Sequence, residues 1–122
     1  MKQTILEFDD SDLKIIDSLQ TLGLKRCTAR VLVFLDRQSE KFSTSLDIEI
    51  GTRMRQPEVC ITMNYLFKNG WVIKKKKPQT KGKGRSMNQY KIKSLRYILD
   101  SIEKQKLKEL EEIQNLKKSV IS

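Results

Sequence analysis

Basic side chains gather in the middle of this chain, in a stretch that contains no acidic residue. Between Glu58 and Asp100 lie eleven of its 25 lysines and arginines. They are Lys68, Lys74, Lys75, Lys76, Lys77, Lys81, Lys83, Arg85, Lys91, Lys93 and Arg96. Ammonium and guanidinium groups at this density bind phosphate groups, and they supply affinity without reading a sequence. The stretch therefore predicts contact with a polyanion.

The residues needed for catalysis or metal binding form no comparable pattern. The chain has no histidine, and its two cysteines, Cys27 and Cys60, lack CxxC spacing. Neither a zinc site nor a histidine-assisted nucleophile is therefore expected. Gly82 and Gly84 lie in a lysine-rich turn rather than before a helix, unlike the glycines of a phosphate-binding loop. We expect no enzyme activity, no cofactor and no metal.

Length and charge limit the core and the partners of the chain. With 122 residues and 38% apolar content it can bury one modest core. A net charge of +10 favours nucleic acid or an anionic membrane as partner. The membrane is disfavoured because no run of 18 apolar residues exists and glutamates accompany the apolar residues near the C-terminus. Acids stand at the N-terminus where a signal peptide has cations, so we expect a cytoplasmic, nucleoid-associated protein.

Two helices are predicted in the first third of the chain. Residues 11–22 place Leu13, Ile16 and Leu19 at helical spacing, and Gly23 is expected to end this helix. Residues 27–38 carry apolar side chains on most sides, which is typical of a helix at the centre of a core.

A short helix, a tight turn and a longer helix follow. Thr44 and Asp47 form the pattern of a capping box, and the helix that they start is expected to end near Gly51. After a turn at 52–54, Pro57 fits the first turn of the longer helix, where its missing N–H is not needed. The longer helix has an apolar face made by Val59, Met63 and Leu66, and it closes at Asn69 and Gly70. This order predicts a helix-turn-helix.

The second helix of such a motif enters the major groove of duplex DNA by its N-terminal residues. The candidate DNA contacts are Arg53, Arg55, Gln56, Glu58 and Ile61, with Thr44 at the start of the first helix. Arginine pairs with guanine and glutamine with adenine through two hydrogen bonds each. Glu58 has an equally good alternative role, because an acid in the first helical turn also caps the helix.

A β-hairpin with a cationic tip is predicted next. Trp71 and Ile73 are expected on one face of its first strand and Val72 on the other, with Trp71 packing at the base of the hairpin. The loop covers 78–86, and Asn88, Tyr90 and Ile92 alternate on the return strand. The candidate DNA contacts of this wing are Lys75, Lys77, Lys81, Lys83 and Arg85. Arg85 suits the minor groove, where a guanidinium group exploits a narrow width.

The C-terminal segment carries a narrow apolar seam. Its residues are Leu95, Leu99, Ile102, Lys106, Leu110, Ile113, Leu116 and Val120, at spacings of three and four. A dimer interface formed by Leu95, Leu99, Ile102, Leu110, Ile113 and Leu116 is expected, with Lys106 interrupting it. The alternative is that the helix folds back on its own domain.

In combination, several of these residues resemble a known family. They are Arg55-Gln56-Pro57-Glu58-Val59, Met63, Leu66, Gly70-Trp71-Val72, Gly82-Lys83-Gly84-Arg85 and Tyr90, within roughly residues 22–93. The combination is similar to archaeal winged-helix transcriptional regulators of the broad ArsR/MarR/TrmB type. Cys60 stands where serine is usual, Ser86 where proline is usual, and Arg53 near a common turn glycine. The resemblance implies a homodimer that binds duplex DNA through two recognition helices and two wings, with terminal helices at the dimer interface.

The sequence thus predicts an α+β, mostly α, fold. A winged helix-turn-helix with a two-stranded wing is expected over 1–93, and a long C-terminal dimerisation helix over 94–122. The expected function is a sequence-selective, dimeric DNA-binding transcriptional regulator, with double-stranded DNA and a second copy as partners. The alternatives are a nucleoid or RNA-binding protein without sequence choice and a winged helix that docks on other proteins. No small-molecule ligand can be inferred.

Overall fold

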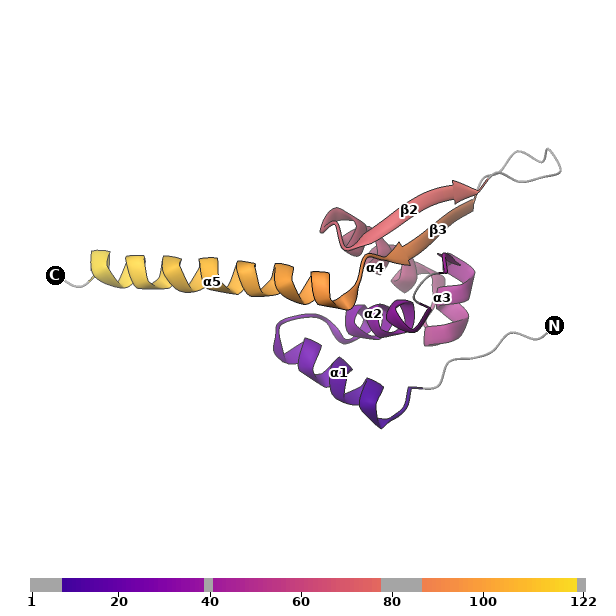
Figure 1. Ribbon diagram of the computed structural model, residues 1–122, viewed down its shortest axis with the longest axis horizontal. Coiled ribbons are helices and arrows are strands. Elements are labelled where there is room, and N and C mark those ends of the chain that lie inside the picture. The colour runs from indigo at the N-terminus through magenta and orange to yellow at the C-terminus, as the bar shows by residue number, and fades with distance from the viewer. Residues whose placement is uncertain (1–7, 39–40, 78–86, 121–122) are drawn as a thin grey trace.

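The computed structural model describes residues 8–38, 41–77 and 87–120. Its elements are α1 (Asp10–Thr21), α2 (Arg26–Gln38), β1 (Ser43–Thr44), α3 (Ser45–Thr52), α4 (Gln56–Lys68), β2 (Val72–Lys77), β3 (Met87–Ile92) and α5 (Leu95–Val120). Helices α2, α3 and α4 gather beneath a small sheet, α1 packs on α2, and α5 runs away from the other elements (Figure 1). None of the described helices is long and apolar enough to cross a membrane.

Helix α1 is held at both ends by local chemistry and along its side by α2. Asp9 and Asp12 form a capping box, and Gly23, at φ 106°, ends the helix as expected. Arg37 near the end of α2 lies 2.6 Å from the buried carboxylate of Asp12 and 2.9 Å from Asp9. The start of one helix is thereby tied to the end of the next.

Helix α2 is the centre of the core, as the sequence predicts. All five side chains from Val31 to Leu35 are buried, together with Thr28 and Ala29. This helix contacts α1, α3, α4 and β3. The elements that carry the candidate site are therefore built around it.

The helix-turn-helix is confirmed. The Thr44 hydroxyl accepts a hydrogen bond from the Asp47 backbone N–H at 3.1 Å, and the Asp47 carboxylate accepts one from the Thr44 backbone N–H at 2.9 Å. Helix α3 ends at Thr52 with Arg53 as its C-cap, and α4 begins at Gln56 with a proline in its first turn. The apolar face made by Val59, Met63 and Leu66 is buried.

The two predicted wing strands are confirmed, and a short strand that the sequence analysis missed joins them. The sheet has the order β1-β3-β2 and is antiparallel throughout, with Ser43 opposite Tyr90 and Val72 opposite Ile92. Tyr90, Val72 and Ile92 lie on the same face of the hairpin. This face packs against the helices. β1 is only two residues long, which is too short to show an alternating pattern.

The expectation that Trp71 and Ile73 share one face at the start of β2 is wrong. Trp71 and Val72 are both buried, whereas Ile73 is 43% exposed. Trp71 precedes the strand, and its ring packs edge-on against Tyr65 with the ring centroids 6.0 Å apart. The predicted role of Trp71 in packing at the base of the wing agrees with its burial.

Helix α5 divides into a packed part and a projecting part. Ile98 and Ile102 are buried in the core of their own domain, and through them the first two turns of α5 pack on it. Ile102 is therefore covered within the chain itself, unlike the other residues of the expected dimer seam. Beyond Ile102 the exposed fraction of the large apolar side chains ranges from 49% at Leu110 to 70% at Val120. Figure 1 shows this part of α5 extending well away from the other helices.

Candidate nucleic-acid interface

The leading end of α4 presents polar side chains to solvent. Arg55, Gln56 and Glu58 are exposed, and Ile61 one turn later is 68% exposed. The Glu58 carboxylate accepts a hydrogen bond from the Arg55 backbone N–H at 3.0 Å. Of the two roles considered for Glu58, capping is the one seen, because one of its oxygens satisfies the start of the helix. The arginine and the glutamine remain free to meet a ligand.

The turn before α4 is closed by a residue in an unusual conformation. Arg53 adopts the left-handed region at φ 59° and ψ 37°, where glycine is normally preferred. Its backbone N–H donates to the Glu49 carbonyl, and its side chain is exposed. Arg53 therefore stands in place of the usual turn glycine, and the left-handed turn is kept. It also adds a cation beside α4.

A buried tyrosine lies where the wing meets the helices. The Tyr90 side chain on β3 is only 7% exposed, and β3 contacts α2, α3 and β1. Burial raises the pKa of the Tyr90 hydroxyl above its ordinary value, so the group remains a neutral hydrogen-bonding phenol. The sequence predicted Tyr90 as part of the alternating pattern of the return strand but did not predict its burial.

The cationic hairpin and the leading end of α4 lie on the same side of the molecule. In Figure 1 the far end of β2 and the α3 region both point away from the free end of α5. Lys74, Lys75 and Lys76 are exposed along β2. The Lys77 backbone ends that strand, whereas Lys81, Lys83 and Arg85 lie outside the described residues.

Aromatic rings accompany the lysines, and the sequence analysis missed them. The Lys74 ammonium lies 4.5 Å from the centre of the Phe67 ring, and the Lys75 ammonium lies 4.3 Å from that of Phe42. Such cation–π contacts hold a flexible lysine in place while leaving its charge accessible. Phe67 lies on α4, and Phe42 immediately precedes β1. Only the fold brings each ring next to its lysine.

A hollow of about 380 Å³ lies on the flank of α4 that faces the start of α2. Lys25, Cys27 and Thr28 line one wall, while Glu58 and Ile61 line another. Sequence analysis predicted no such feature. Its edge includes two of the residues assigned to the DNA-facing surface.

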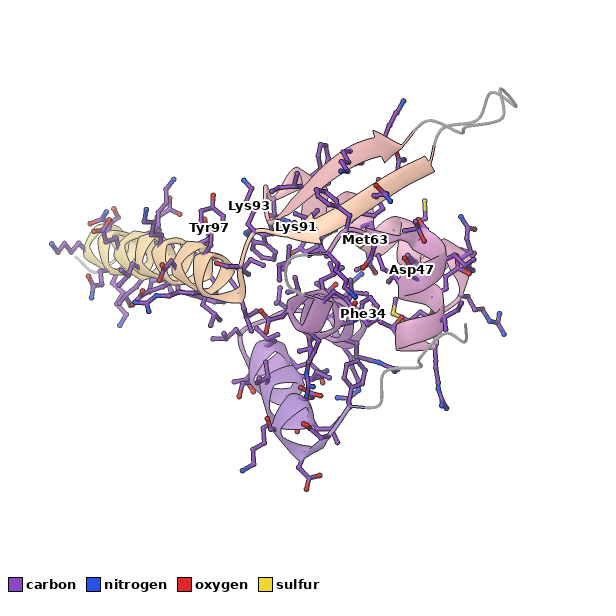
Figure 2. All side chains as sticks on the ribbon, turned by 45° about the vertical axis from the view of Figure 1, so that its right-hand side comes forward. Phe34, Asp47, Met63, Lys91, Lys93 and Tyr97 are labelled. Carbon is purple, nitrogen blue, oxygen red and sulfur yellow. The ribbon has the colours of Figure 1, made fainter. Side chains whose placement is uncertain are left out.

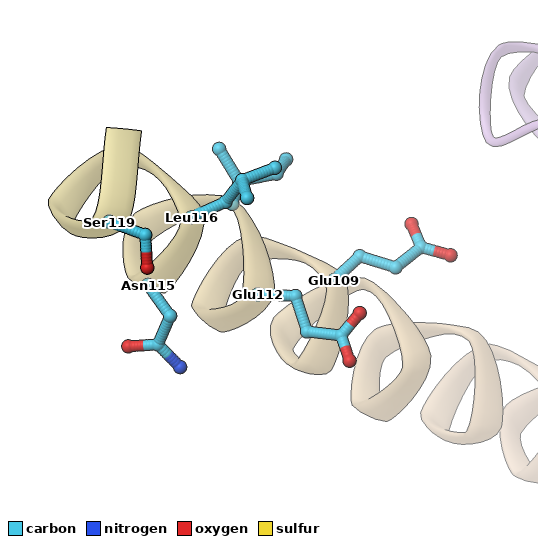
Figure 3. Close-up of a pocket in the computed structure, with 6 residues that line it drawn as sticks. Glu109, Glu112, Asn115, Leu116 and Ser119 are labelled. Atoms are coloured by element: carbon cyan, nitrogen blue, oxygen red, sulfur yellow. The ribbon is translucent and has the colours of Figure 1, made fainter. Parts of the chain in front are cut away.

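The projecting part of α5 offers a second candidate surface. Figure 3 shows Glu109, Glu112, Asn115, Leu116 and Ser119 near the end of this helix. They line an open hollow on its surface. Ile113 and Leu116 remain 52% and 62% exposed there. Lys106 points back toward the domain, with its Nζ 3.7 Å from where a Cβ on Gly23 would lie.

The fold and this surface define the winged helix-turn-helix class, as the resemblance implied. A possible transcriptional regulator from Methanosarcina mazei Go1 superposes with a TM-score of 0.71 at 13% identity, covering 99% of this chain and 100% of that one. MepR, a transcription regulator of the Staphylococcus aureus multidrug efflux pump MepA, gives 0.52 at 14% identity over 89% and 84%. A complex of S. aureus MepR with DNA gives 0.51 at 14% identity over 90% of each chain. No family model matches this sequence, and no curated protein matches it.

Proposed function

We propose that this protein is a sequence-selective, dimeric DNA-binding transcription regulator. The structures that share its fold are described as regulators of transcription, and one of them is bound to DNA. In the proposed complex α4 enters the major groove, and the lysine-rich hairpin grips the backbone and the adjacent minor groove. A protein of this kind acts on chromosomal DNA, at the nucleoid.

The observation that carries the proposal is the placement of the wing beside the recognition helix. β3 contacts α3 and β2 contacts α4, and the Lys74 ammonium on β2 lies 4.5 Å from the centre of the Phe67 ring on α4. A duplex that met Arg55 and Gln56 would therefore also meet Lys74 and Lys76, the exposed lysines on the face of β2 toward α4. Base contacts from α4 would provide selectivity, while lysine–phosphate contacts would provide affinity.

The dimer is proposed to form through the projecting part of α5. Leu99, Leu110, Ile113 and Leu116 are 40% to 62% exposed, and burying them against a second helix would remove that apolar area from water. Leu95 is half-buried at the start of the helix and would flank the contact. The 26-residue helix is about 39 Å long, far beyond what its own domain covers. Two copies would then present α4 to half-sites about one helical turn apart.

The test is a selection of binding sites from random duplex DNA with the full chain and with Arg55→Ala. The wild type should enrich a site, and Arg55→Ala should lose preference at one base position of each half-site. Arg96→Ala provides a matched control, because Arg96 is an exposed arginine on α5 outside the proposed surface. An Arg55→Ala selection that returned the wild-type site would show that Arg55 does not read a base.

The alternatives give different results in the same assay. A nucleoid or RNA-binding protein without sequence choice would bind random and selected duplex equally tightly. A winged helix that docks on other proteins would bind neither duplex at low salt. Either result would overturn the proposed selectivity.

A further inference from the structure

The side of the sheet that faces away from the helices is a second cationic surface. Residues opposite one another in an antiparallel pair share a face, and Ile73 pairs with Lys91. Val72 and Ile92, one position along, are buried against the helices, so Ile73 and Lys91 point outward. Lys75 lies on this same outward face, two residues beyond Ile73.

The surface continues past the end of β3 into α5. The Lys93 backbone N–H donates to the Trp71 carbonyl at 3.1 Å, which extends the ladder by one bond and places Lys93 on the same face as Lys91. Figure 2 shows Lys91, Lys93 and Tyr97 together where the strand gives way to α5. We call Ile73, Lys75, Lys91 and Lys93, with Phe42 and Tyr97, the outer sheet face.

An aromatic ring stands at each end of this row of lysines. The ammonium groups of Lys75 and Lys91 lie 4.3 Å and 5.7 Å from the centre of the Phe42 ring. The Lys93 ammonium lies 5.2 Å from the centre of the Tyr97 ring, and Tyr97 is 47% exposed. Ile73 adds an exposed apolar side chain between them. The strand residues of the outer sheet face include no acid.

Duplex DNA held by α4 would leave this face unused. The outer sheet face points away from the helices, whereas the contact of Lys74 with the Phe67 ring places α4 on the other side of the sheet. The exposed Tyr97 ring and the half-buried Phe42 ring would gain little from a closed duplex, whose bases are already stacked. Unstacked bases can stack on aromatic side chains while their phosphates meet lysines, which is how non-specific single-strand binders work.

We propose that the outer sheet face binds single-stranded nucleic acid, separately from the duplex-binding surface. Bases stack on Tyr97 and Phe42, and the intervening phosphates meet Lys91 and Lys93. An acidic peptide would satisfy the same lysines but would gain nothing comparable from the rings. The contribution of the bases therefore separates the two kinds of partner. This inference stands whether or not α4 reads duplex DNA.

The experiment measures fluorescence anisotropy of a labelled thymidine oligonucleotide of twelve or so residues on the full chain, at constant salt. Tyr97→Leu and Phe42→Leu should each weaken binding about tenfold, because stacking on one ring carries an effect of that order. Tyr65→Leu is the matched control, since Tyr65 is 44% exposed but lies on α4. Lys93→Gln should reduce the salt dependence by about one released counterion.

Two competitors complete the test. An abasic oligonucleotide of the same length and a poly-glutamate of similar charge should both compete poorly, and Tyr97→Leu should leave duplex affinity unchanged. The proposal fails if the abasic strand or the poly-glutamate binds as tightly as the thymidine strand. It also fails if Tyr97→Leu and Phe42→Leu bind the single strand like the wild type, provided that their circular dichroism shows a folded chain.

Discussion

The ring of Phe34 in α2 lies directly over Gly51 in α3. A Cβ placed on Gly51 would come within 2.1 Å of Phe34 Cε1, so no side chain fits at residue 51 without moving the ring. This close approach fixes the first helix of the helix-turn-helix against the central core helix.

Gly51→Ala should therefore lower the free energy of unfolding by about 1–3 kcal/mol, the usual cost of overpacking a core. Denaturant unfolding followed by circular dichroism measures the change. Phe34→Leu should itself destabilise the fold, yet the double variant should lose less than the sum of the two single losses because the smaller side chain makes room. Strict additivity would show that the ring is not what excludes the Cβ.

Two substitutions of Arg53, which adopts a left-handed conformation, should distinguish an effect on stability from an effect on DNA binding. Arg53→Gly should raise the free energy of unfolding by up to about 1 kcal/mol, because glycine adopts φ 59° without strain, less its own entropy cost. Arg53→Ala removes the same cation but keeps the strain, so it should not stabilise. Both variants should lose DNA affinity equally. Unequal losses, measured on one duplex at one salt concentration, would mean that the turn rather than the charge matters.

The two parts of α5 should respond differently to mutation. Ile98→Ala should cost about 2–5 kcal/mol of unfolding free energy, because it empties a fully buried position. Ile113→Asp should keep the domain folded while abolishing the dimer, as sedimentation equilibrium would reveal. Gln114→Asp, at an exposed position on the same helix, serves as the control because it adds the same single negative charge. A wild type that sediments as a monomer at high concentration would contradict the proposed pairing.

Stability should fall in acid through Asp9. The Asp12 backbone N–H and the Arg37 side chain hold the pKa of Asp9 below its ordinary 3.8. A carboxylate with a lowered folded pKa contributes stability above the unfolded value, and that contribution is lost as the pH falls through the folded pKa. The stability difference between wild type and Asp9→Asn should thus be constant near pH 6 and shrink below pH 3.8. Urea unfolding across this range checks it, and a difference that grew in acid would refute the assignment.

Duplex binding should depend steeply on salt. If six or more phosphates are engaged, affinity should fall by roughly a thousandfold between 50 and 200 mM salt. Replacing Lys76 by glutamine should lower the slope of log affinity against log salt by about one, whereas Lys104→Gln on α5 should leave it unchanged. A shallow slope for the wild type would mean that the wing lysines do not reach the backbone.

Local sequence was sufficient for most elements, because caps and periodicity act over a few residues. Thr44 with Asp47 marks one helix start, Gly23 one helix end, and the spacing of Val59, Met63 and Leu66 one buried face. These signals need no knowledge of the rest of the chain. The outward position of Arg55 follows from them as well.

What the tertiary structure decided involves residues distant in sequence. Arg37 meets Asp12 across 25 positions, and Lys75 meets the Phe42 ring across a larger gap. Whether Ile102 faces a partner or its own core is likewise invisible to periodicity, since both surfaces require the same apolar spacing. Sequence alone determined which segments form the helices and the two wing strands, and where the positive charge gathers. Only packing decided which faces are buried, and so which charged and aromatic groups share a surface.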